Sequence, residues 1–346
     1  MARILYGISG DGFGHAARSQ EVIRHLEQAG HKLLLVSYDR GYQMLSKSFT
    51  VHKITGLRLK YERNEVKYLA TVAQNLINSP ANLKSLNRVL ALTKKFRPQL
   101  VITDFEPTVT LAANWLNLPL ISLDNMHILT KAKLDIPAKH RANYLTAKLV
   151  IRLMVVNASR YIVLSFFPAK ANSSKAIIAP PIIRQEILGL KPSYGEHILV
   201  YLTAGNSADI LPILRASLGS YIIYGLNKTG TDGNLTFKNF GARDYLKDLA
   251  NSRAIIATAG FSLVSEALYL AKPYLALTIK SQFEQFINGY YLQKLGYGMM
   301  TEVLDHNTLK KFLKALPRFT KKLAGYHSVG NQSAFKSLDQ TIEELL

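Results

Sequence analysis

Residues 8–19, ISGDGFGHAARS, decide the fold at the N-terminus. They follow a short apolar run, RILYGI at residues 3–8, and lead into a segment of helical periodicity that ends near Gly30. Glycines between a strand and a helix permit positive φ angles and let backbone amides approach a ligand, and the first helical turn favours negative charge. The stretch therefore predicts a strand, a turn that binds a phosphate or an acceptor, and a helix. The turn consists of Gly10, Gly12, Phe13 and Gly14.

His15 stands where a dinucleotide-binding fingerprint, G-x-G-x-x-G, needs a third small residue. This difference argues against a nicotinamide cofactor. It presents an imidazole in the first turn of a helix, at the carboxyl edge of a sheet, where ligands bind. We interpret His15 as a general base, while a histidine at a helix start can also be a capping or packing residue.

Short apolar runs alternate with helical segments along the whole chain, which is typical of parallel sheets flanked by helices. The pattern predicts an α/β fold of two Rossmann-like domains that face each other across a cleft. We expect domains at residues 1–183 and 197–329, a proline-containing linker at 184–196, and a C-terminal helix at 330–346 that packs back on the N-terminal domain. Asn331 is the expected N-cap of that helix. The predicted strands are RILYGI, KLLLVS, QLVITD, PLISLD and RYIVLS, then HILVYLTA, YIIYG, AIIATA and PYLALTI.

The composition limits the possible partners. The chain has 346 residues, no cysteine and a formal net charge of +20, which favours an anionic partner such as a nucleotide, a lipid headgroup or a nucleic acid. Signatures of a recognition helix, a zinc site or an RNP motif are absent from the sequence, so we expect no nucleic-acid partner. The N-terminus resembles no signal peptide, and the uncharged stretch 107–123 predicts a core helix and a strand, so we expect a cytoplasmic protein.

A second informative stretch is residues 257–298. A strand ends just before Gly260, and a helix that begins near Ser262 carries Glu266 one turn later. We expect Gly260, Phe261, Ser262 and Leu263 to hold a diphosphate through backbone amides, and Glu266 to accept hydrogen bonds from a ribose. The polar side chains that begin the next helix suit sugar hydroxyls, or form the solvated face of an ordinary amphipathic helix. They are Glu284, Gln285 and Asn288.

Taken together, the segments G-x-G-x-G-H, G-(x5)-E and E-Q-x-x-N-G resemble the GT-B glycosyltransferases of the MurG and UDP-glucuronosyltransferase type, over most of the chain. The resemblance implies that Glu266 holds the nucleotide ribose, that Glu284 and Gln285 contact the transferred sugar, and that His15 is the base. It implies that Asp104, at the end of LVITD, orients His15. It places the nucleotide base near Phe240 and Gly241.

The chain departs from this pattern at Thr258, where many plant-type members have a histidine. A diphosphate contact must then come from elsewhere, and the predicted candidates are Lys280 and the segment Gly205, Asn206 and Ser207.

These residues predict an inverting hexosyltransferase that uses a nucleotide sugar, expected to be a UDP-sugar, as co-substrate and no cofactor. The sequence contains no D-x-D motif, so we expect turnover without a metal; Asp104-Phe105-Glu106 is the nearest alternative, a D-x-E that could bind Mg²⁺. Two other functions remain open. A nucleotide-sugar 2-epimerase of GT-B fold would share the donor site, and a nucleic-acid-binding protein would share the charge.

The acceptor is inferred from two basic segments, residues 57–97 and 131–160. In the second, apolar residues alternate with cations at helical spacing. This pattern predicts either a helix that lies on an anionic membrane, with a lipid or lipid-linked acceptor for cell-envelope glycan or glycolipid synthesis, or an apolar stripe that belongs to the core. The apolar residues are Tyr144, Leu145, Leu149, Val150, Leu153 and Met154.

Overall fold

The computed structural model describes residues 1–56, 61–62, 65–66, 79–202, 204–278 and 282–346. The chain forms two compact units. The first contains residues 1–60, 67–184 and 329–346, and the second contains residues 61–66 and 185–328. These bounds differ from the predicted ones at 61–66 and 185–196, which belong to the second unit, and at residues 184 and 329, which belong to the first.

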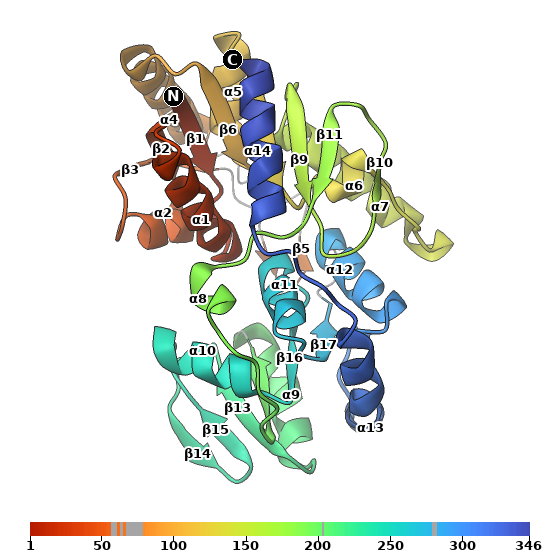
Figure 1. The fold of residues 1–346 in the computed structure, drawn as a ribbon. Coiled ribbons are helices and arrows are strands. Elements are labelled where there is room, and N and C mark those ends of the chain that lie inside the picture. Colours follow the sequence, from red (N-terminus) through yellow and green to blue (C-terminus); the bar gives the residue numbers. More distant parts are fainter. Residues whose placement is uncertain (57–60, 63–64, 67–78, 203, 279–281) are drawn as a thin grey trace. The chain divides into compact units, whose positions relative to one another are not determined.

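The first unit is built on a seven-stranded parallel sheet in the order β11-β9-β7-β6-β1-β2-β3 (Figure 1). All five strands predicted in this half are present. The sequence analysis missed β3 and β11, which are short strands at the two edges. The strands are β1 (Arg3–Ile8), β2 (Lys32–Ser37), β3 (Val51–Lys53), β6 (Leu100–Asp104), β7 (Leu120–Asp124), β9 (Arg160–Leu164) and β11 (Ala176–Ala179).

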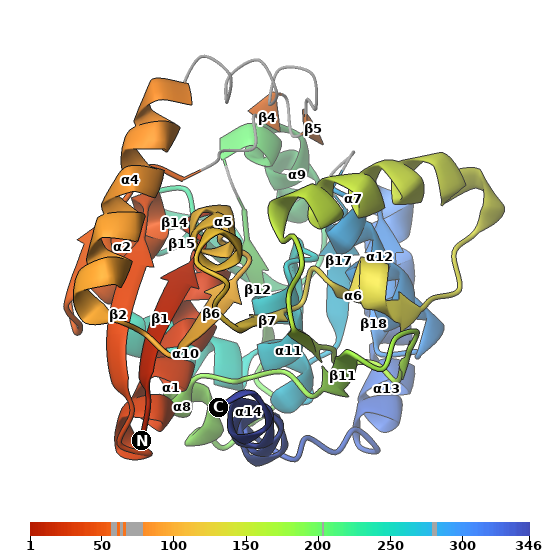
Figure 2. The ribbon, with the colours of Figure 1, turned by 90° about the horizontal axis from the view of Figure 1, so that it is seen from above.

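Helices cover both faces of this sheet, as right-handed crossovers require. Figure 2 shows α1 (Gly14–Gln28) and α14 (Gln332–Leu345) on one face, and α4 (Ser79–Phe96), α5 (Pro107–Trp115) and α7 (Arg141–Met154) on the other. The smaller elements are α2 (Asp39–Leu45), α6 (Ile128–Lys131), the 3-10 turn Ala138–His140, and the antiparallel pair β8 (Ala132–Lys133) and β10 (Lys170–Ala171).

The C-terminal helix α14 packs on the first unit, as predicted, against β9 and β11. Asn331 occupies its N-cap position, but its side chain makes no capping bond. Instead, Asn331 accepts a hydrogen bond from the backbone N–H of Ile183 at 2.7 Å and donates one to the carbonyl of Ile183 at 2.7 Å. The side chain therefore fastens the end of the chain to the segment that leaves β11.

The second unit contains a seven-stranded sheet in the order β14-β15-β13-β12-β16-β17-β18, parallel except for the β14–β15 pair. The four predicted strands are present, and β14, β15 and β18 were missed. The strands are β12 (His197–Tyr201), β13 (Ser220–Tyr224), β14 (Gly230–Asp232), β15 (Leu235–Phe237), β16 (Ala254–Thr258), β17 (Tyr274–Leu277) and β18 (Gly298–Thr301), with a separate hairpin of β4 (Tyr61–Glu62) and β5 (Glu65–Val66).

The helices of the second unit follow its strands in the βα alternation. They are α8 (Gln185–Leu188), α9 (Ala204–Arg215), α10 (Ala242–Asn251), α11 (Phe261–Tyr269), α12 (Phe283–Lys294) and α13 (His306–Leu323). Asp305 caps α13 by accepting the amide of Thr308 at 2.6 Å. Apolar residues at three- and four-residue spacing on α13 join the core of the sheet, and each contributes about 1.5–3 kcal/mol by burial. They are Leu309, Phe312, Leu316 and Phe319.

The predicted linker is bound to the second unit. Ser193 and Gly195 donate backbone hydrogen bonds to the carbonyls of Ala250 and Asn251 at 3.0 and 2.8 Å. The ammonium group of Lys272, which is fully buried, donates to the carbonyl of Ser193 at 2.5 Å. Residues 185–196 are therefore part of the second unit and not an unattached linker. Within the described part of the chain, no helix is long and apolar enough to cross a membrane.

Each sheet has a switch point where successive crossovers leave in opposite directions. In the first unit it lies between β1 and β6, and in the second between β12 and β16. Loops at the carboxyl ends of such strands diverge, which leaves room for a ligand. The residues predicted to be functional gather at these two edges.

Candidate active site

The glycine turn of the first unit lies at its switch point. Ile8 and Asp104 are paired at the ends of β1 and β6. At Gly10, a Cβ atom would lie 2.1 Å from the carbonyl oxygen of Tyr38, so only glycine fits there. At Gly12, nothing would obstruct a side chain, but the φ angle of +86° favours glycine. The turn thus needs its glycines for close backbone packing and for its conformation. The chain then enters α1 at Gly14, and Phe13, which is exposed, lies under the guanidinium of Arg40.

His15 and Asp104 are in direct contact. His15 Nδ1 lies 2.8 Å from Asp104 Oδ1, and the side chain of His15 remains 15% exposed while that of Asp104 is buried. His15 Nδ1 also lies 2.8 Å from Arg18 Nη2, an atom that only donates hydrogen bonds. An ionised carboxylate accepts a proton carried on Nδ1, and in that tautomer the lone pair is on Nε2. This arrangement can accept a proton from a ligand.

Arg18, one turn further along α1, keeps Asp104 ionised. Its Nε and Nη2 atoms donate to the two carboxylate oxygens of Asp104 at 2.7 and 2.5 Å. Burial by itself raises the pKa of Asp104, but the charges of Arg18 and His15 and their hydrogen bonds lower it to about 2. The carboxylate is therefore charged at neutral pH and can hold the Nδ1 proton of His15.

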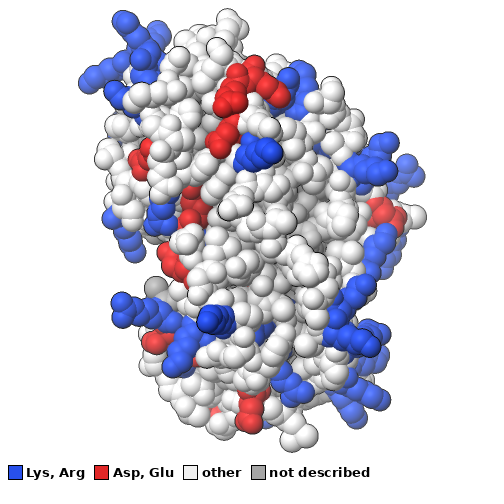
Figure 3. Space-filling view, viewed as in Figure 1, with Lys and Arg blue, Asp and Glu red and all other residues white. Residues whose placement is uncertain are grey.

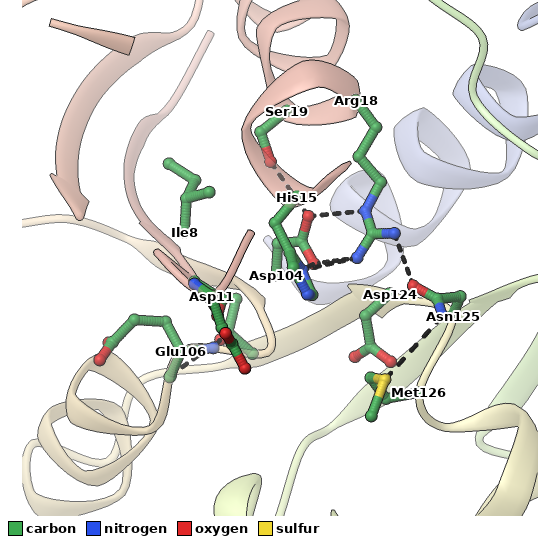
Figure 4. A network of polar contacts seen from close by, with 12 residues as sticks. Ile8, Asp11, His15, Arg18, Ser19, Asp104, Glu106, Asp124, Asn125 and Met126 are labelled. Atoms are coloured by element: carbon green, nitrogen blue, oxygen red, sulfur yellow. Dashed lines mark hydrogen bonds and ion pairs between the residues drawn. The ribbon is translucent and has the colours of Figure 1, made fainter. Parts of the chain in front are cut away.

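Further polar side chains surround this carboxylate (Figure 4). Ser19 donates to Asp104 Oδ2 at 3.1 Å and lies 2.8 Å from the hydroxyl of Tyr6. Arg18 Nη1 donates to Asn125 Oδ1 at 2.5 Å, so the guanidinium joins the ends of β6 and β7. The sequence analysis missed Arg18, Ser19 and Asn125. The sequence held a signal for Asn125. Both strands, LVITD and LISLD, were predicted, and Asn125 directly follows the second of them.

A second buried His–Asp pair lies at the end of β7. Asp124 accepts the backbone N–H of His127 at 2.9 Å, and His127 Nδ1 lies 2.8 Å from Asp124 Oδ2. Ser122 donates to the same oxygen at 2.6 Å. His127 is almost fully buried, between Phe105 and Tyr161. His127 is the N-cap residue of the short helix α6, its side chain makes no capping bond, and it is less accessible than His15.

The carboxylates of the D-x-E sequence are engaged by protein donors. Glu106 caps α5 by accepting the amides of Thr108 and Val109 at 3.0 and 2.7 Å. Phe105 between them has a φ of +56°, a conformation rare for a residue with a side chain, and Asp104 and Glu106 point in different directions (Figure 4). Among the described residues, no group of three or more His, Cys, Asp or Glu side chains is arranged to hold a metal ion.

In the second unit, α9 and α11 begin at the carboxyl ends of the neighbouring strands β12 and β16. Gly260 is the N-cap of α11, and a Cβ atom there would meet no atom of the described residues within 4 Å. Its φ of −65° is one that any residue adopts. Neither packing nor backbone conformation therefore explains this glycine, and the space beside it is open to a ligand.

The predicted nucleotide residues on these helices differ in exposure. Phe261 and Glu266 are buried, whereas Ser262 and Leu263 are half-buried at the start of α11. Ser207 lies in the first turn of α9 and is also half-buried. Gly205 and Asn206 belong to the same turn, and their side chains lie outside the described part of the chain. Lys280 lies outside the described residues.

Helix α12 brings its polar residues to the same edge. Asn288 is buried, and its amide donates to the carbonyl of Ala259 at 2.9 Å and to Glu284 Oε1 at 2.5 Å. It therefore positions Glu284 beside the turn that contains Gly260. The side-chain oxygens of Gln282 and Gln285 are buried and have no hydrogen-bond partner among the described residues. A buried acceptor without a donor is costly, so a bound ligand with hydroxyl groups would stabilise this turn.

Aromatic side chains gather beside α10. Phe240 is exposed, and its ring centroid lies 5.5, 5.4 and 5.2 Å from those of Tyr201, Tyr224 and Tyr245. Gly241 is the N-cap of α10. The cluster extends along the carboxyl edge from β12 to β15 and presents an aromatic face of the kind on which a nucleotide base stacks.

Comparison with known families matches residues 2–317 to the family described as "Glycosyl transferase family 1". Two relatives, each named "Uncharacterized glycosyltransferase", come from Methanosarcina acetivorans and Methanosarcina mazei. The first is 23% identical over 370 residues, which covers 93% of this chain and 95% of the relative. The second is 24% identical over 372 residues, which covers 94% and 96%.

Solved structures with the same fold include the spinosyn forosaminyltransferase SpnP, which has a TM-score of 0.66, 13% identity and 99% coverage of both chains. Another is the glycosyltransferase VinC in complex with dTDP, which has a TM-score of 0.64, 16% identity, and coverage of 99% of this chain and 98% of VinC. At these identities the likeness establishes the fold alone. That fold is GT-B, with two units that each contain a Rossmann-like sheet.

Proposed function

This chain belongs to glycosyl transferase family 1 and is a glycosyltransferase, and we propose that it transfers a hexose from a nucleotide sugar to a hydroxyl acceptor with inversion at the anomeric carbon. The donor we propose is a UDP-sugar, and the acceptor a lipid or lipid-linked molecule. The observation that carries the proposed mechanism is the 2.8 Å contact between His15 Nδ1 and the ionised carboxylate of Asp104. In the tautomer that we propose, Nδ1 donates to this carboxylate and Nε2 is left as an acceptor.

In the proposed reaction, the acceptor hydroxyl donates its proton to His15 Nε2 while its oxygen attacks the anomeric carbon. A carbon–oxygen bond forms on one face of the sugar, and the bond to the diphosphate oxygen breaks on the other face. The electron pair of that bond leaves with the nucleoside diphosphate. Asp104 stabilises the imidazolium that forms, and the amides at the starts of α9 and α11 stabilise the negative charge of the leaving group.

Three observations support a nucleotide-sugar site in the second unit. Two helix N-termini lie at the switch point, and Gly260 leaves open space beside one of them. The oxygens of Gln282 and Gln285 lack donors that sugar hydroxyls would supply. VinC, which has the same fold, holds a nucleoside diphosphate, dTDP. Glu266 suits a ribose with both hydroxyls, which favours UDP over a deoxynucleotide.

Donor binding can be tested by a thermal-shift screen with UDP-, GDP-, dTDP- and CMP-sugars. A ligand that binds only the folded protein raises its melting temperature, so we expect a UDP-sugar to give the largest rise. Gly260→Ala should leave the unliganded melting temperature unchanged and weaken the UDP-sugar about tenfold, because the methyl group would enter the space left for the diphosphate. Gly325→Ala, at an exposed position in the same unit, is the matched control.

Failure of every nucleotide sugar to raise the melting temperature would contradict the donor site, as would equal effects of the two glycine variants. An assay of donor consumption with and without an acceptor distinguishes a transferase from a 2-epimerase. A 2-epimerase converts or hydrolyses the donor when no acceptor is present, whereas we expect the donor to be consumed only when a hydroxyl acceptor is added.

A further inference from the structure

One face of the first unit is free of acidic residues on its helices. The sheet face covered by α4, α5 and α7 (Figure 2) carries no Asp or Glu within these three helices. Basic residues lie on α4 and α7, and none of them forms an ion pair with a described residue. They are Lys84, Arg88, Lys94, Lys95, Arg141, Lys148 and Arg152.

The apolar stripe of α7 faces away from the core. Leu145, Leu149 and Leu153 follow one another at four-residue spacing, and their exposed fractions are 57%, 59% and 69%. The residues of this helix that are buried are Ala147 and Ile151. Of the two alternatives left open for the apolar stripe, the core does not hold for these three leucines, while Tyr144, Val150 and Met154 are half-buried. Burying three leucine side chains in an apolar phase is worth several kcal/mol in total, and no described residue of this unit buries them.

Other apolar side chains are exposed on the same face. Leu111 and Trp115 are exposed on α5, and Leu83 is exposed on α4. Asn114 of α5 donates to the carbonyl of Val156 at 2.8 Å, just beyond the end of α7, so α5 and the end of α7 are neighbours. The face therefore combines large apolar side chains, one of them a tryptophan, with lysine and arginine.

Positive charge is concentrated at one end of α7. The ammonium group of Lys131 lies 3.9 Å from the centre of the Tyr161 ring. Burial lowers the pKa of Lys131, and the nearby positive charges of Arg152 and Lys175 lower it further. On the opposite face of the unit, over α1 and α14, acidic side chains lie among the basic ones (Figure 3), and α14 carries Asp339, Glu343 and Glu344.

We propose that the face formed by α4, α5 and α7 binds an anionic lipid bilayer, with the leucines of α7 inserted among the acyl chains and the cations at the phosphate level. Apolar and cationic side chains on one helix face are what such a surface recognises. A second copy of this chain would bring like charges together, which disfavours a dimer through this face. A membrane-bound face would bring the enzyme to a lipid-linked acceptor. Only this link to the acceptor rests on the proposed function; the binding of the bilayer itself does not.

The test is co-sedimentation of the full chain with vesicles of phosphatidylcholine, with and without phosphatidylglycerol. We expect binding to the anionic vesicles that weakens as salt is raised. Neither donor nor acceptor is present, so failure of this assay is distinct from failure of sugar transfer. Absence of binding to anionic vesicles at low salt would overturn the proposal.

Two pairs of variants locate the surface. Leu145→Gln/Leu149→Gln/Leu153→Gln should lower binding at least about tenfold, whereas Leu218→Gln, at an exposed leucine of the second unit, should not change it. Lys148→Ser/Arg152→Ser should weaken binding more than Lys310→Ser/Lys311→Ser, which removes the same charge from α13. The melting temperature of each variant and its response to a UDP-sugar verify that the fold is kept.

Equal binding by the leucine variant and the wild type would overturn the proposal, as would equal effects of the two charge variants. Light scattering adds a further outcome. If the wild type is a dimer in solution and the leucine variant is a monomer, the face is an interface between copies of the chain, and the bilayer is not its partner.

Discussion

His15 and Arg18 lie one turn apart on α1 and share the carboxylate of Asp104, with His15 Nδ1 and Arg18 Nη2 both within hydrogen-bond distance of Oδ1. The guanidinium keeps the carboxylate charged, and its Nη2 atom also lies 2.8 Å from His15 Nδ1. In the proposed mechanism the charged carboxylate accepts the Nδ1 proton of the histidine. Asn125 holds Arg18 from the other side, at 2.5 Å. The orientation of His15 thus depends on residues from α1, β6 and the end of β7.

Arg18→Met should destabilise the first unit by about 3–5 kcal/mol, because Asp104 would be left as a buried charge without its main partner. Urea unfolding measures this change. Arg18→Met/Asp104→Asn should recover part of the loss, because the carboxylate is then neutral. A double variant whose loss equals the sum of the two single losses would contradict the coupling. In turnover, Arg18→Lys should lower kcat while leaving the affinity for the donor unchanged, because Arg18 acts through Asp104.

Acid should weaken the first unit between pH 4 and pH 2. The pKa of Asp104 is about 2 in the folded chain and 3.8 when unperturbed, so the folded state favours the charged form. A depressed pKa gives stability that is present above the unfolded value and is lost as pH falls through the folded value, here about 2 kcal/mol. Hydrogen exchange of β6 and α1 across this range measures it. Asp104→Asn should flatten the profile; an unchanged profile would show that other carboxyl groups cause the loss.

Glu266→Ala should weaken UDP about ten- to a hundredfold, the effect of losing hydrogen bonds to a charged acceptor. The loss should be smaller for dUDP, which lacks the 2′-hydroxyl. Isothermal titration with both nucleotides, on wild type and variant, provides the comparison. Equal losses for UDP and dUDP would mean that Glu266 acts through the fold of α11 and not through the ribose.

Turnover should continue after treatment with EDTA. Asp104 is held by Arg18 and His15, and Glu106 caps α5, so the acidic pair nearest the glycine turn is already engaged by protein donors. The proposed mechanism stabilises the diphosphate with helix amides instead of a metal ion. Activity that disappears with EDTA and returns with Mg²⁺ or Mn²⁺ would contradict this expectation.

The sequence predicted the main elements because their signals are local. Buried strands appear as apolar runs, the glycine turn precedes α1, and helical spacing indicates α14. The missed strands β3, β11 and β14 are edge strands of three or four residues. β3 and β14 have no distinct apolar run, whereas β11, AIIA, is an apolar run that ends directly before Pro180. The proximity of His15 and Asp104 was expected from the family resemblance, and the structure brings them to 2.8 Å.

Other features depend on contacts that sequence periodicity does not contain. Arg18 can bridge Asp104 and Asn125 only because β1, β6 and β7 are neighbours in the sheet. These contacts join residues about a hundred positions apart in the sequence. The apolar stripe of α7 was visible, but the pattern alone did not decide whether it faces the sheet. Here the small residue Ala147, together with Ile151, faces inward, and the leucines remain outside. Likewise, only the folded chain shows that Asn288 positions Glu284 and that Gln285 has an unpartnered oxygen.

The central claim is that His15 removes the proton of the acceptor, and the most direct measurement is the steady-state kcat of His15→Ala together with its dissociation constant for the donor. The proposed role predicts a kcat about two to four orders of magnitude lower, with the dissociation constant nearly unchanged. A variant that turns over at nearly the wild-type rate would contradict it.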